Sequence, residues 1–228
     1  MSDRPVHEAA FEGDVDALRR ELENGGSPNA LGDCDFTPLH HLCFGGGGAE
    51  AQVACVRMLI DAGAEINAPD QYQWTPLLFA ASNSHAIVVA ALIKAGADVN
   101  RGNENNKTPL HWACRRVDSD VEPALLLLRN GAAVNVRDDD GDTPLDFAIA
   151  NPRGRRFVPI LLRTGATLPA ESDDAYLRKV IAASGFGRYE RTHLDALVAT
   201  FAPKFAHRSL PPEMVRRVVE YAFHAGHY

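Results

Sequence analysis

Short apolar segments alternate with polar, glycine-containing segments over the first 168 residues. The clearest apolar segments are Ala86–Ile93 and Leu125–Leu128, and Gly96 and Gly131 follow within a few residues. Glycine after a helix supplies the left-handed residue that ends it, so this pattern predicts short helices closed by glycine. The segment Ala86–Ile93 is apolar nearly all round. Such a helix is expected to be buried on both sides by neighbouring helices.

A phrase of the type Thr-Pro-Leu-His recurs at the start of the apolar segments. Its proline stands at positions 5, 38, 76, 109 and 144, so the steps are 33, 38, 33 and 35 residues. Threonine caps a helix by accepting a hydrogen bond from a free N–H group. Proline fits the first helical turn, where its missing N–H is not needed. The five copies therefore predict five helix starts.

A second phrase, Gly-Ala-x-x-Asn, closes the repeating unit. From each of the asparagines at 29, 67, 100 and 135 to the next phrase proline there are nine residues. From each phrase proline to the closing glycine there are 20, 25, 20, 22 and 21 residues. The connection between units therefore has a fixed length, and the insertions are predicted between the two helices of a unit, as stacking requires.

Self-similarity at this period, carried by Thr-Pro-Leu-His, resembles the ankyrin repeat. The resemblance covers five repeats, at about residues 1–31, 32–68, 69–101, 102–136 and 137–168, in a predicted domain over residues 1–170. It implies an all-α fold with short β-hairpin loops, an ankyrin-repeat solenoid with a C-terminal helical cap. In the family, the histidine hydrogen-bonds the threonine of its own phrase. Leu78 and Asp146 replace it here, which implies a weaker polar link in the third and fifth repeats.

Residues 171–228 form a predicted second segment in which the repeat is lost. Helices are expected near 173–184, 189–201 and 212–224, with Gly185, Gly187 and Pro203 between them. We interpret this tail as a helical cap on the open end of the fifth repeat. Its end also resembles the opening helix of F-box motifs and the cullin-selecting half of a SOCS box. The residues that would dock a ubiquitin-ligase scaffold in that case are Leu210, Pro211, Glu213, Met214 and Val218.

The resemblance implies that hairpin tips and first helices line one concave, partner-binding face. Two aligned rows on that face are rich in aromatic residues, which are the usual anchors of interfaces. An alternative is that Phe79 and Phe147 fill gaps between helices. The acidic run at 138–142 either favours a basic partner segment or is a solvated turn. The predicted partner-binding residues are Phe36, His41, Tyr72, Trp74, Phe79, Lys107, Trp112 and Phe147.

Composition narrows the classes of partner. The net charge of −7 argues against nucleic acid. No uncharged apolar run is long enough for membrane insertion. The sequence begins without a signal-peptide pattern, and its four cysteines form no Cys-x-x-Cys pair, so we expect a reducing compartment, the cytoplasm or the nucleus. We expect a monomer outside a complex.

The residues give no support for catalysis, a cofactor or a metal. Gly45–Gly48 lacks the Lys-Ser/Thr that a phosphate-binding loop needs, so we interpret it as an insertion. Cys34, His40, His41 and Cys43 fit no standard zinc spacing. The resemblance implies one modification, asparaginyl hydroxylation, for asparagines with leucine eight residues earlier, unless these side chains only tie the hairpin turn. The candidates are Asn67, Asn100 and Asn135.

These observations predict a non-catalytic protein–protein interaction module or scaffold that binds a protein partner through its concave face. Two alternatives stay open. One is a substrate-recognition adaptor of a cullin-type ubiquitin ligase, with the ankyrin face for the substrate and the tail for the scaffold. The other is a structural subunit of a larger assembly.

Overall fold

The computed structural model describes residues 4–45, 47–83, 85–115, 120–151, 154–183 and 185–205. The chain divides into two compact units, Met1–Thr164 and Gly165–Tyr228, and each is described by itself. Within the described residues no strand is present, and the hairpin loops are turns. The helices of the first unit are α1 (Arg4–Glu12), α2 (Val15–Glu23), α3 (Pro38–Phe44), α4 (Ala49–Asp61), α5 (Pro76–Ser82), α6 (Ala86–Lys94), α7 (Pro109–Arg115), α8 (Glu122–Arg129), α9 (Pro144–Ala150) and α10 (Phe157–Arg163).

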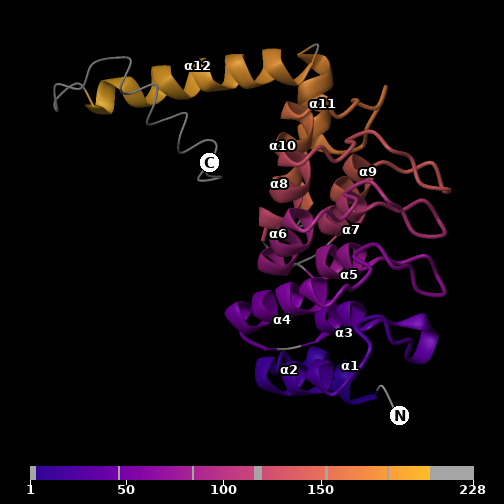
Figure 1. Cartoon of the computed structure of the whole chain (residues 1–228). Coiled ribbons are helices and arrows are strands. Elements are labelled where there is room, and N and C mark those ends of the chain that lie inside the picture. The colour runs from indigo at the N-terminus through magenta and orange to yellow at the C-terminus, as the bar shows by residue number, and fades with distance from the viewer. Residues whose placement is uncertain are drawn as a thin grey trace. The chain divides into compact units, whose positions relative to one another are not determined.

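These helices form two layers (Figure 1). The first helix of each repeat packs on the first helix of the next, in the order α1, α3, α5, α7 and α9. The second helices α2, α4, α6 and α8 stack in the same way. The hairpin loops project from the side of the first helices (Figure 1). The all-α solenoid predicted from the sequence is confirmed.

The recurring phrase starts the first helix of each repeat from the second onward. Thr37, Thr75 and Thr143 occupy the N-cap position in extended conformation, and the following proline stands in the first turn. The next residue of the phrase faces the core in every case. The leucines Leu39, Leu77, Leu110 and Leu145 are all buried. The phrase therefore fixes both the start of the helix and its buried face.

The phrase histidines join consecutive repeats. Nδ1 of His40 accepts a 3.0 Å hydrogen bond from the backbone N–H of Thr37, and Nε2 lies 3.1 Å from the carbonyl oxygen of Trp74 in the next repeat. His111 repeats the pattern with Asp142, at 3.2 Å. His7 reaches the carbonyl oxygen of Phe36 at 3.1 Å. One buried ring thus caps its own helix and holds the following hairpin.

The two departures from histidine differ in their effect. In the third repeat, Leu78 is buried and only its backbone N–H reaches the Thr75 hydroxyl, at 3.4 Å, in keeping with a weaker polar link. In the fifth repeat, Oδ2 of Asp146 accepts hydrogen bonds from the backbone N–H and the hydroxyl of Thr143, at 2.8 and 2.7 Å. The predicted weakening is therefore wrong for the fifth repeat, because a carboxylate accepts both hydrogen bonds.

The asparagines that close each repeat clamp the next one. Nδ2 of Asn100 donates to the carbonyl oxygen of Gly131 at 3.1 Å, and its Oδ1 accepts from the N–H of Ala133 at 2.7 Å. Asn29 makes the same pair of hydrogen bonds, and Oδ1 of Asn67 accepts one from the next repeat. These side chains tie neighbouring repeats together rather than their own turn. Hydroxylation at these positions stays a prediction.

The insertion in the second repeat forms helix, not a long loop. Helix α4 has 13 residues and α6 has 9, a difference of four. The connection between the helices has four residues in the second repeat and three in the third, which accounts for the fifth inserted residue. A Cβ on Gly45 would collide with the backbone of Phe11, so the first of the four glycines allows a close approach of α3 and α1.

Helix α6 departs from the expectation of burial on both sides. Val88, Val89 and Leu92 are fully buried, but the side chain of Ile87 is 49% exposed. Helix α6 belongs to the layer of second helices, which we call the outer layer, and its neighbours there leave part of its apolar surface uncovered.

In the second unit the structure describes two helices, α11 (Ala175–Ala182) and α12 (Phe186–Phe205). Gly185, with a φ of 115°, separates them. Gly187 and Pro203 were expected between helices, but both lie inside α12. The expected helix at 212–224 and the scaffold-docking residues Leu210, Pro211, Glu213, Met214 and Val218 lie outside the described residues. The predicted cap and its domain boundary stay predictions.

The buried histidines predict a loss of stability on acidification. Burial lowers the pKa of His40 and His111 below the ordinary value of 6.5, against the raising effect of their bonds to backbone carbonyls. Because the folded-state pKa of each histidine is depressed, the histidine contributes its full stabilisation above pH 6.5. This stabilisation is lost as the pH falls through the folded-state pKa. We expect the free energy of unfolding in urea to fall between about pH 7.5 and about pH 5.5.

The matched variant is His40→Leu with His111→Leu, which copies the leucine of the third repeat. It should be less stable at neutral pH, but its stability should depend less on pH over the same interval. An unchanged pH dependence in the variant would show that His40 and His111 do not cause the loss of stability at low pH.

The asparagine clamp predicts a second stability effect. Asn100→Ala removes two hydrogen bonds between repeats and should lower the free energy of unfolding by about 1–2 kcal/mol. Asn130→Ala is the control, because Asn130 is also exposed but its side chain bonds only Leu126 of its own helix. Urea unfolding followed by circular dichroism compares the two. Equal losses in both variants would exclude a specific role for the clamp.

Candidate protein-binding face

The hairpin tips are held by buried acidic or amide side chains. Oδ1 of Asp70 accepts hydrogen bonds from the N–H groups of Tyr72 and Trp74, and Asp138 and Asn103 act in the same way in their own tips. Backbone bonds of 3.2 Å also join successive tips. The tips therefore form a continuous, ordered edge beside the first helices.

An aromatic strip runs along this face from the second to the fourth repeat. We define it by the residues Phe36, His41, Phe44, Trp74, Phe79 and Trp112. The ring of Phe79 lies at its centre, with centroid distances of 5.1 Å to Phe36 and 4.8 Å to Trp74. Trp74 lies 4.6 Å from Trp112, and Phe36 lies 5.6 Å from His41. Each ring touches another, so the strip is one packed surface.

Most rings of the strip are half-buried. Phe36, His41, Trp74, Phe79 and Trp112 all have intermediate exposure. The indole N–H of Trp112 is buried and has no hydrogen-bond partner among the described residues. The rings therefore fill the spaces between repeats with one side and face solvent with the other. Packing between repeats and exposure on the surface are thus compatible for the same ring.

The other predicted partner-binding residues lie apart from the strip. Phe147 contacts His111 at 5.2 Å and lies beneath the ammonium group of Lys107, at 5.9 Å. The Lys107 ammonium pairs with Asp140 at 3.0 Å, and this hydrogen bond raises the pKa of the lysine. Tyr72 is 51% exposed at a hairpin tip. The structure thus brings five of the eight predicted residues into one strip.

Sequence reasoning missed two members of this face. Phe44 is 59% exposed and its ring lies 6.1 Å from Phe79. The guanidinium of Arg115 lies 5.1 Å from the ring of Trp112. Both stand six residues after a phrase proline, whereas His41 and Trp112 stand three residues after it. Residues three apart share one side of a helix, so this second row was readable from the alignment.

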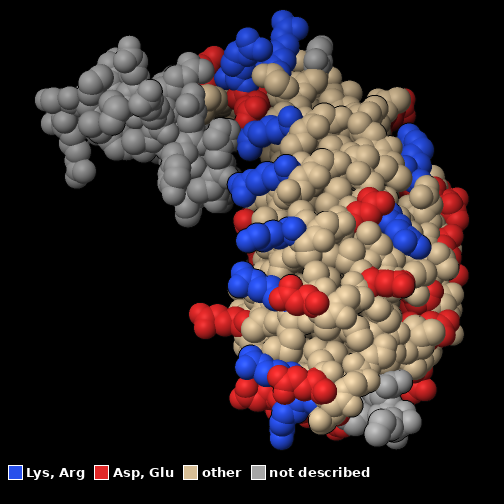
Figure 2. Space-filling model, in the orientation of Figure 1, with Lys and Arg blue, Asp and Glu red and all other residues tan. Residues whose placement is uncertain are grey.

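The tips that border the strip carry acidic charge. Figure 2 shows acidic side chains along the edge where Figure 1 places the hairpin loops. The hairpin edge beside the strip is therefore mainly acidic. The exposed acidic residues of the tips are Asp33, Asp35, Glu104, Asp139, Asp140 and Asp142.

His40 and Cys43, which adjoin residues of the strip in sequence, are buried. Both ring nitrogens of His40 contact the chain, and burial raises the pKa of the Cys43 thiol well above its usual range. Burial lowers the pKa of His41. Within the described residues no three His, Cys, Asp or Glu side chains are grouped to hold a metal ion. No helix in that part of the chain is long and apolar enough to cross a bilayer.

A stack of helix pairs with an ordered hairpin edge defines the class of helical-repeat solenoids. Family models described as ankyrin repeats match residues 6–103 and 92–148. The chain belongs to the ankyrin-repeat family and is a protein–protein interaction module.

Two relatives share only parts of their length with this chain. The RelA-associated inhibitor of Mus musculus is 27% identical over 176 residues, which are 73% of this chain and 20% of that protein. The potassium channel KOR1 of Oryza sativa subsp. japonica is 39% identical over 69 residues, 30% of this chain and 8% of the channel. The chain therefore spans a fifth or less of the length of these relatives.

The contact between the two tryptophans predicts a spectroscopic signature. They are the only tryptophans of the chain, and centroids 4.6 Å apart should couple their electronic transitions. We expect an exciton couplet in the circular dichroism of the folded protein. Trp74→Phe and Trp112→Phe should each abolish it while the helical signal stays, and a couplet that survives either change would contradict the contact.

Proposed function

We propose that this protein is a non-catalytic binding module that recognises a protein partner through the aromatic strip on its concave face. The observation that carries the proposal is the packing of six aromatic rings from three consecutive repeats into one half-exposed surface. Large rings held rigid by their neighbours lose little conformational freedom on binding, which is the property of interface anchors.

The charges around the strip support a partner segment with apolar and basic residues. Acidic side chains at the hairpin tips attract cations, and such complementarity raises the association rate more than the affinity. All four cysteines are free thiols, which supports a reducing compartment such as the cytoplasm or nucleus. The mouse relative is named as an inhibitor associated with another protein, RelA, which accords with this class of function.

The ubiquitin-ligase adaptor and the permanent subunit remain the alternatives. The adaptor hypothesis depends on residues 210–218, outside the described part of the chain. The subunit hypothesis predicts co-purification at a fixed stoichiometry.

The experiment that tests the proposal is an affinity pull-down from a source lysate with three forms of the protein: intact, Trp74→Ala/Trp112→Ala, and a chain ending at Ala206. We expect the double variant to lose the main partners and the truncated chain to keep them. Circular dichroism checks that both forms are folded. Tyr189→Ala is the matched control, because Tyr189 is a half-buried ring of α12 and belongs to none of the predicted partner-binding residues.

Other outcomes discriminate among the functions. Loss of cullin-type partners on truncation alone would favour the adaptor. Retention of all partners by the double variant would exclude the strip as the binding surface.

A further inference from the structure

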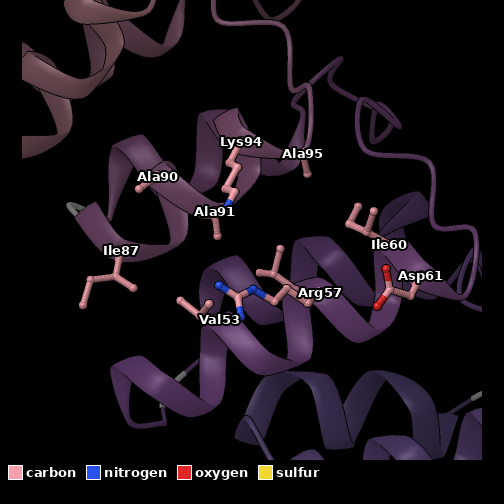
Figure 3. Close-up of a pocket in the computed structure, with 10 residues that line it drawn as sticks. Val53, Arg57, Ile60, Asp61, Ile87, Ala90, Ala91, Lys94 and Ala95 are labelled. Atoms are coloured by element: carbon pink, nitrogen blue, oxygen red, sulfur yellow. The ribbon is translucent and has the colours of Figure 1, made fainter.

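The outer layer contains an apolar groove between α4 and α6, on different helices from those that carry the aromatic strip. Its volume is about 420 Å³. Figure 3 shows side chains of both helices directed into the space between them. The apolar lining comes mainly from Val53, Val56, Ile60, Ile87, Ala90 and Ala91. The exposed face of α6 noted above forms one wall.

Small residues on α6 create the groove. Ala90 and Ala91 stand six and five residues before the closing Gly96. The same positions of the fourth repeat hold Leu125 and Leu126. Two large aliphatic side chains are thus replaced by methyl groups, while the insertion lengthens α4 on the opposite wall. The hollow follows from the residues of one repeat rather than from the repeat architecture.

The rim of the groove is positively charged within a negative protein. Arg57 and Lys94 extend from facing helices into the space, and Asp61 lies towards the end of α4 (Figure 3). Two cations and one anion give a net charge of +1. Arg57 and Lys94 are exposed, and neither makes an ion pair with a described residue. An anionic group over the groove would therefore meet a net positive charge.

We propose that this groove binds an amphipathic helix of a protein partner, one that presents aliphatic side chains to the groove and an acidic residue to Arg57 and Lys94. The walls are helices, whose backbone groups are already hydrogen-bonded, so an extended strand has no edge to pair with. Recognition must therefore use side chains. Helix α4 offers a wall of about 20 Å, at 1.5 Å per residue, which matches a few helical turns of a partner.

The test uses a phage-displayed library of amphipathic helical peptides selected on the full chain. Affinities of the selected peptides are measured by fluorescence polarisation. We expect enrichment of Asp or Glu beside aliphatic residues, and methyl NMR shifts at Val53, Ile60 and Ile87 on titration. Arg57→Glu/Lys94→Glu should weaken binding by about tenfold or more.

A second variant tests the cavity without changing charge. Ala91→Leu places in α6 the residue that α8 holds at the aligned position, so the fold should tolerate it. It should abolish binding because the leucine fills the groove. The charge-matched control is Arg19→Glu/Arg129→Glu, which changes the aligned residues of α2 and α8 and should leave the affinity unchanged.

The aromatic strip provides the last control. Trp74→Ala/Trp112→Ala should bind the selected peptides as the intact chain does. Loss of peptide binding in that variant would place the peptides on the strip and overturn the groove proposal while supporting the function proposed above. Peptides without acidic enrichment, binding that survives Ala91→Leu, or a selection that yields no binder would also overturn it.

Discussion

The structure depends on polar side chains that reach from one repeat into the next. His40 and His111 each use one ring nitrogen for their own helix and the other for the following hairpin, and Asn100 clamps the start of the next hairpin. A buried polar group left without a partner costs about 1–3 kcal/mol, so a shift in the stacking of repeats is strongly disfavoured. The constant nine-residue spacing between asparagine and proline is the sequence counterpart of this register.

The aromatic strip is a consequence of that register. Fixed stacking brings Trp74 to within 4.6 Å of Trp112 and Phe79 to within 5.1 Å of Phe36, although these pairs are far apart in sequence. Each ring packs part of its surface against other rings of the strip and exposes the remaining part to solvent. The rings are therefore ordered by their neighbours, and a surface of this kind loses little entropy on association.

The layer of first helices and the layer of second helices are under different structural constraints. The first helices and the hairpins carry the bridges of His40, His111 and Asn100, and the nine-residue spacing from asparagine to proline is fixed. The second helices vary in length and in side-chain size, as α4 and α6 show. In a solenoid each repeat contacts mainly its neighbours, so a local change such as Ala90 and Ala91 creates a groove without disturbing distant repeats.

The sequence alone determined the repeat, the helix starts, the closing glycines and the buried leucines, because capping, turn chemistry and helical periodicity are local. It also placed Trp74, Phe79 and Trp112 on one face. Only the tertiary structure decided that the second-repeat insertion extends α4 and that Ile87 stays exposed. These outcomes depend on the sizes of side chains about one repeat apart, and packing between such residues is set by the stacked repeats rather than by any local pattern.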